Sequence, residues 1–171
     1  MSMHQPPSET VIHRNPEELL QNLIRFDTTN PPGNEAECVG YIDRLLVAAG
    51  LQTVLIGHQP NRPNLIACLS GRGDAPPLLL YGHVDVVTTA NQKWTYPPFE
   101  GRVAEGCIWG RGALDMKGGV AMMLAALLRA KAEGLVPAMG GLLTLARRAA
   151  AIGPNGEPFG VAETDRAFPV W

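Results

Sequence analysis

Apolar residues recur along this chain with two periods, and each period predicts a different kind of element. Segments with helical spacing begin at Asn15, at residue 35 and at residue 116, and strand-like stretches cover 51–58, 64–70, 77–87 and 140–146. Helices that alternate in this way with strands are typical of an α/β fold. The pattern therefore predicts a mostly parallel central sheet flanked by helices on both faces.

The strand predicted over 77–87 has an unusual composition. Residues 78–80 are three consecutive leucines without polar alternation, which predicts a strand buried on both of its faces. The stretch then continues through Gly82 to His83 and Asp85. The carboxyl end of a buried strand is where ligands usually bind in open α/β sheets, so these two side chains are candidates for chemistry.

His83 and Asp85 lie two positions apart, so in an extended chain they point to the same side. Asp85 can then hydrogen-bond one imidazole nitrogen of His83 and leave the other free to bind a metal. Asp115 lies in a glycine-rich loop before the third helix and could reach the same pocket. An imidazole and a carboxylate are suitable ligands for zinc, cobalt or manganese.

Each of these residues also has a purely structural interpretation. His83 could be a satisfied structural residue, Asp85 a turn former, and Asp115 the N-cap of the following helix. The loop Gly110–Gly119 could instead bind a phosphate or nucleotide, although it lacks the complete P-loop motif. Spacing alone leaves these alternatives open.

Composition removes several classes of function. The 171 residues are 46% hydrophobic and 18% charged with a net charge of −2, so nothing indicates a nucleic-acid partner. No apolar run approaches the roughly 20 residues that cross a bilayer. The polar N-terminus does not resemble a signal peptide, and the three cysteines, Cys38, Cys68 and Cys107, form no CxxC pair. We therefore expect a cytoplasmic protein without a membrane partner.

Four separated stretches together resemble the M20 family of zinc peptidases and deacylases, which includes glutamate carboxypeptidases, aminoacylases, acetylornithine deacetylase and succinyl-diaminopimelate desuccinylase. They are FDTTNPPGNE, LLLYGHVDVV, PPFEG and IWGRGALDMKGG, with a tryptophan before the third. The resemblance implies the N-terminal half of a zinc-peptidase-like catalytic domain over 15–146. The residues outside it predict a flexible tail over 1–14 and an atypical C-terminal tail over 147–171.

The resemblance also implies a role for each candidate residue. His83 would bind one zinc ion, Asp115 would bridge two, and Asp85 would be a catalytic residue that supports His83 from behind. The peptide bond after Asp115 is often cis in the family. The implied reaction is the hydrolysis of an amide in an N-acyl amino acid or a short peptide, with a glutamate that moves the proton.

The chain departs from the family pattern after residue 146. The family has two adjacent glutamates at this point, a general base and a zinc ligand, whereas this chain has Arg147 and Arg148. We therefore expect a truncated or degenerate copy with weak activity or none, which could form a homo-oligomer. The alternatives are a non-catalytic, partner-binding protein and the phosphate-binding module described above.

Overall fold

The computed structural model describes residues 9–145, 151–152 and 158–159 of the chain. The α-helices of this part are α1 (Pro16–Arg25), α2 (Ala36–Ala48) and α3 (Gly118–Ala132). Each lies within one residue or two of a predicted start. Asn15 caps the start of α1, since its side chain accepts a hydrogen bond of 3.2 Å from the Glu18 backbone N–H and Pro16 occupies the first turn.

Part of the flexible tail predicted over residues 1–14 is helical, and residues 1–8 lie outside the described residues. Residues Glu9–Arg14 form a 3₁₀ helix, η1, and Ile12 is only 4% exposed within the hydrophobic core. Burial of this one apolar side chain explains why the segment is ordered against the domain. In the region 147–171, the described residues form two short paired strands, β7 (Ala151–Ile152) and β8 (Pro158–Phe159).

A four-stranded sheet carries the candidate site, and its strands follow the order β1-β2-β6-β3. Their bounds are Gln52–Ile56 for β1, Asn64–Leu69 for β2, Ala75–Gly82 for β3 and Met139–Leu145 for β6. The α/β class is confirmed, but the prediction of a mostly parallel sheet is wrong. β1 with β2 and β2 with β6 are antiparallel, and β3 with β6 is parallel.

Connection length explains the strand directions. Parallel neighbours need a crossover of a dozen or more residues, and the links over 57–63 and 70–74 are shorter, so each reverses the chain. The link that contains α3 is long enough, and it places β6 parallel to β3. β6 lies between β3 and β2, and it is therefore antiparallel to β2.

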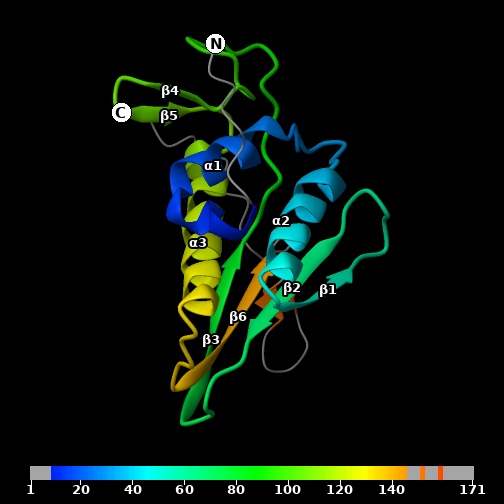
Figure 1. Cartoon of the computed structure of the whole chain (residues 1–171). Coiled ribbons are helices and arrows are strands. Elements are labelled where there is room, and N and C mark those ends of the chain that lie inside the picture. Colours follow the sequence, from blue (N-terminus) through cyan, green and yellow to red (C-terminus); the bar gives the residue numbers. More distant parts are fainter. Residues whose placement is uncertain (1–8, 146–150, 153–157, 160–171) are drawn as a thin grey trace.

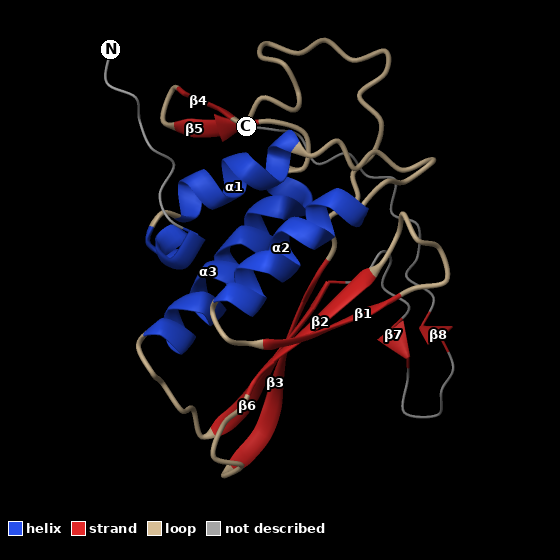
Figure 2. Ribbon diagram, turned by 45° about the vertical axis from the view of Figure 1, so that its right-hand side comes forward, coloured by secondary structure: helices blue, strands red, loops and turns tan. Residues whose placement is uncertain are grey.

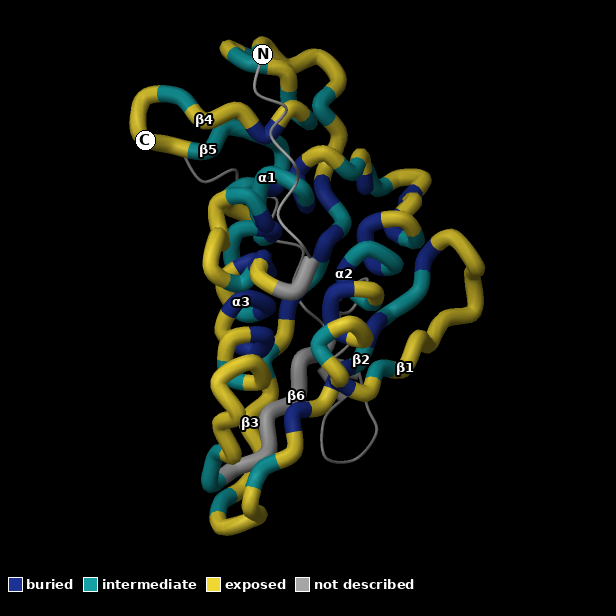
Figure 3. The backbone as a smooth tube through the Cα atoms, in the orientation of Figure 1, coloured by how far each residue is buried: buried dark blue, intermediate teal, exposed yellow. Residues whose placement is uncertain are grey.

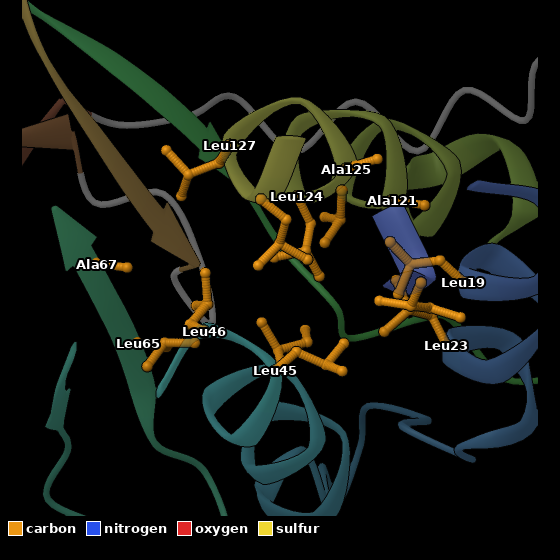
Figure 4. Close-up of a cluster of buried hydrophobic side chains, with 14 of the residues drawn as sticks. Leu19, Leu23, Leu45, Leu46, Leu65, Ala67, Ala121, Leu124, Ala125 and Leu127 are labelled. Carbon is orange, nitrogen blue, oxygen red and sulfur yellow. The ribbon is translucent and has the colours of Figure 1, made fainter. Parts of the chain in front are cut away.

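The helices of the described residues gather on one face of this sheet (Figures 1 and 2). Burial along β2 confirms this layering, because Leu65, Ala67 and Leu69 are buried while Ile66 and Cys68 are not. Figure 4 shows the core between the two layers, where Leu45 and Leu46 of α2 and Leu124 of α3 meet Leu65 of β2. The prediction of helices on both faces does not hold for the described part of the chain.

β3 is much more exposed than its leucines predict (Figure 3). Leu78, Leu79 and Tyr81 are 48%, 57% and 39% exposed. β3 is an edge strand, and no described helix covers the face to which Leu79 points, so the expected burial on both faces is wrong. Exposed apolar edge strands are prone to pair with other chains, so a homo-oligomer remains a prediction.

A small hairpin lies near α1 and away from the four-stranded sheet (Figures 1 and 2), outside the stretches for which the sequence predicted strands. β4 (Arg102–Ala104) pairs antiparallel with β5 (Cys107–Trp109). The turn residues Glu105 and Gly106 both have positive φ, as the two central residues of a type I′ hairpin turn require.

Among the described residues, no helix is both long and apolar enough to cross a membrane.

The buried thiol of Cys38 gives the fold a testable dependence on alkaline pH. Burial raises the pKa of Cys38 from 9.0 to about 11. The raised pKa favours the neutral thiol in the folded chain, so this contribution is complete below about pH 9 and is lost as pH rises towards 11. We expect the free energy of unfolding to fall by up to about 1.4 kcal/mol per pH unit in this window.

Urea denaturation at about pH 8 and about pH 11, with Cys38→Ala as the reference, measures this contribution. Other groups titrate equally in both proteins, so the stability difference between them isolates Cys38. An equal decline in both proteins would contradict the assignment.

Candidate metal centre

His83 and Asp85 follow directly on β3, where the chain leaves the sheet. The Nδ1 atom of His83 lies 3.1 Å from Asp85 Oδ1 and 3.1 Å from the Asp85 carbonyl oxygen. Both neighbours are acceptors when Asp85 is ionised, so a neutral His83 carries its proton on Nδ1. Its Nε2 atom then presents a lone pair on the opposite side of the ring.

Asp115 lies on that opposite side. Its Oδ1 atom is 3.3 Å from His83 Nε2, and its side chain is 87% exposed. Two ligands of one tetrahedral zinc ion, each about 2.0–2.1 Å from the metal, would lie roughly 3.3 Å apart. The pair of donor atoms thus fits a shared divalent cation, and the structure brings together all three residues that the sequence analysis singled out.

The segment that carries Asp115 is η2 (Ala113–Lys117), a short helical turn in front of α3. It begins after Gly112, whose φ of +80° favours glycine, and the Asp115–Met116 peptide bond is cis, as the resemblance implied. The buried Lys117 donates a 2.8 Å hydrogen bond from Nζ to the Phe26 carbonyl oxygen. This bond ties the Asp115 segment to the chain just beyond α1.

The electrostatics favour an ionised Asp85 beside His83. The hydrogen bond that His83 Nδ1 donates to the Asp85 carboxylate raises the pKa of His83, although burial of the imidazole lowers that pKa. Burial alone would raise the pKa of Asp85, but the hydrogen bonds from His83 and Asn30 outweigh it and lower that pKa. A negative charge held at Nδ1 makes Nε2 a more basic donor towards a cation.

Sequence reasoning missed Asn30, the second partner of the Asp85 carboxylate. Its Nδ2 atom donates a 2.9 Å hydrogen bond to Asp85 Oδ2. The stretch that contains Asn30, FDTTNPPGNE, was used only as part of the family resemblance, with no role given to any one of its residues. The one available signal was that this stretch is part of the family resemblance.

The described residues supply only part of a zinc site. Within the described ranges, no group of three or more His, Cys, Asp or Glu side chains could hold a metal ion. Zinc prefers about four ligands. The region 147–171, where the sequence analysis placed the departure from the family pattern, lies outside the described residues except for β7 and β8.

Close packing explains three glycines of the loop Gly110–Gly119. A Cβ at Gly110 would overlap Ile24, one at Gly112 would overlap Val86, and one at Gly118 would overlap the Ala113 carbonyl oxygen. These glycines let the loop lie against the protein itself, so their presence does not favour the phosphate-binding alternative.

Comparison with known proteins identifies relatives of this chain. Residues 79–145, which contain all three candidate residues, match the profile of peptidase family M20/M25/M40. A deformylase of N-formyl-4-amino-5-aminomethyl-2-methylpyrimidine from Halalkalibacterium halodurans is 38% identical over 123 residues, which are 68% of this chain and 29% of the relative. The chain belongs to the M20 family.

Solved M20 structures share the fold of this M20 chain. The metallo-carboxypeptidase Sso-CP2 from Sulfolobus solfataricus superposes with a TM-score of 0.67 at 20% identity, over 77% of this chain and 30% of that protein. The dinuclear metal-binding peptidase YXEP from Bacillus subtilis has a TM-score of 0.55 at 16% identity, over 79% of this chain and 35% of that protein. This M20 chain corresponds to the N-terminal part of such proteins and spans under a third of the deformylase.

Proposed function

We propose that this chain provides His83 and Asp115 as ligands of the divalent-cation centre of an M20-type amide hydrolase. Asp85 is the catalytic residue that orients His83 and increases its basicity. The observation that carries the proposal is the 3.3 Å approach of Asp115 Oδ1 to His83 Nε2, with Asp85 on the other ring nitrogen. Zinc is the proposed metal, in two ions, with cobalt or manganese as substitutes.

The proposed substrates are N-acyl amino acids or short peptides. A divalent cation bound here would polarise the amide carbonyl and lower the pKa of water. The chain's own residues would bind that cation and hold the imidazole in one orientation. The deformylase relative and the metallo-carboxypeptidase of the same fold support an amide as the scissile bond.

We further propose that the 171-residue chain alone hydrolyses amides weakly or not at all. The described residues offer two donors, fewer than the roughly four that zinc takes. Lack of a general base alone would lower the rate by about 10²–10⁴-fold. Robust zinc-dependent hydrolysis of N-acetyl amino acids or dipeptides by the purified chain would refute this part of the proposal.

Zinc binding tests the proposed site directly. Titration of the chain against a chromophoric zinc chelator should show binding, and His83→Ala or Asp115→Ala should weaken it by more than about 100-fold, beyond the roughly 10–100-fold effect of an outer-shell change. His58→Ala is the matched control, because His58 is exposed in the connection between β1 and β2. If the chain binds no zinc, or if all three variants bind it equally, the alternative of a non-catalytic protein is favoured.

A further inference from the structure

The Asp85 carboxylate is held from two sides. Oδ1 lies 3.1 Å from His83 Nδ1, and Oδ2 accepts the 2.9 Å hydrogen bond from Asn30 Nδ2. Asp85 is 17% exposed, so water competes little for either oxygen. A carboxylate that is fixed at both oxygens cannot rotate about its own axis without losing one of these contacts.

The backbone fixes the position of Asn30. Its N–H donates to the Val86 carbonyl oxygen at 2.8 Å, and the Val86 N–H donates to the Thr28 carbonyl oxygen at 3.1 Å. Residues 28–30 thus run beside 84–86, where Thr29 and Val86 form a parallel bridge. The buried Thr28 hydroxyl adds a 2.5 Å hydrogen bond to the Val84 carbonyl oxygen. The amide of Asn30 is therefore presented to Asp85 by two segments that are hydrogen-bonded to each other.

We propose that Asn30 is a positioning residue of the metal centre, which fixes the Asp85 carboxylate and thereby turns His83 Nε2 towards Asp115. The inference rests on the proposed function, since it assigns a purpose to the same site. An amide suits this position because it donates a hydrogen bond to a carboxylate without adding a charge.

Asn30→Leu tests this role because leucine has a similar size and offers no donor. We expect the dissociation constant for Zn²⁺, measured by chelator competition, to rise by up to the roughly 10–100-fold that is typical for loss of a ligand's own partner, which here is Asp85. The matched control is Asn22→Leu, since Asn22 is also half-buried and donates a 3.1 Å hydrogen bond to Tyr41 away from the site. Its zinc affinity should equal that of the wild type. An unchanged affinity in Asn30→Leu would overturn the inference.

A double-mutant cycle separates positioning from general damage to the fold. If Asn30 acts through Asp85, Asn30→Leu should cause no further loss of zinc affinity once Asp85→Ala is present. Equal losses in both backgrounds would show that Asn30 acts independently of Asp85, which contradicts the proposal.

Crystal structures of the metal-free proteins distinguish failure of this inference from failure of the proposed function. In Asn30→Leu the Asp85 carboxylate should leave the Nδ1 atom of His83 or occupy several orientations, whereas Asn22→Leu should keep the 3.1 Å contact. If the wild type binds no zinc, the proposed function is wrong, but the metal-free structures of the two variants can still be compared. If the Asp85 carboxylate keeps its position in Asn30→Leu, Asn30 is not a positioning residue, whether or not the wild type binds zinc.

Discussion

Replacement of Leu124 by alanine is expected to lower the free energy of unfolding by about 3 to 5 kcal/mol. Leu124 is fully buried on α3, and it meets residues of α2 and the sheet in the core shown in Figure 4. Truncation removes its transfer free energy and leaves a cavity that helices anchored on several sides cannot fill. This loss is a large share of the roughly 5–15 kcal/mol that stabilises an ordinary domain.

Met122→Ala is the matched control for Leu124→Ala. Met122 lies on the same helix but is 67% exposed, so its replacement should change stability by no more than about 0.5 kcal/mol. Urea denaturation of both variants at neutral pH measures the difference. A loss below about 1 kcal/mol in Leu124→Ala would mean that α3 is not packed on the sheet as the structure shows.

The local elements could be predicted from the sequence because their causes are local. Asn15 and Pro16, for example, mark the start of α1, because a capping side chain and a proline in the first turn act within that turn. Strand directions and burial depend instead on which elements become neighbours. The three leucines of β3 resemble a strand buried on both faces, yet β3 is an edge strand and Leu79 is 57% exposed. The small hairpin was missed although its turn, Glu105–Gly106, has a typical glycine.

In the candidate site too, contacts within one segment could be predicted, and contacts between distant segments could not be predicted from spacing alone. The two-residue spacing of His83 and Asp85 predicted their contact, because side chains two apart in an extended chain share a side. Asp115 could be placed opposite them only through the glycine-rich loop and the family resemblance. Asn30 contacts Asp85 across 55 residues of sequence, and that contact depends on the pairing of 28–30 with 84–86. The hydrophobic pattern within each segment does not indicate that the two segments pair.

Loss of the Glu35 carboxylate is expected to destabilise the chain by about 3 to 5 kcal/mol. Arg62 donates hydrogen bonds from Nε and from a terminal nitrogen to the two oxygens of Glu35, at 2.9 and 2.8 Å. The side chains are 6% and 1% exposed. Glu35→Ala leaves the guanidinium buried and uncompensated, and a Cβ at Gly33 would overlap it, so neighbouring backbone confines it.

The exposed pair of Arg72 and Asp74 provides the control. Its 2.7 Å contact is shorter, but the side chains are 56% and 59% exposed, so Asp74→Ala should cost no more than about 1 kcal/mol. Denaturation of both alanine variants, and of the double variant Glu35→Leu with Arg62→Leu, measures the effect of burial. The double variant should lose less stability than Glu35→Ala, because it leaves no buried charge. Equal losses of stability in Glu35→Ala and Asp74→Ala would show that burial of the Arg62–Glu35 pair does not increase the cost of removing its carboxylate.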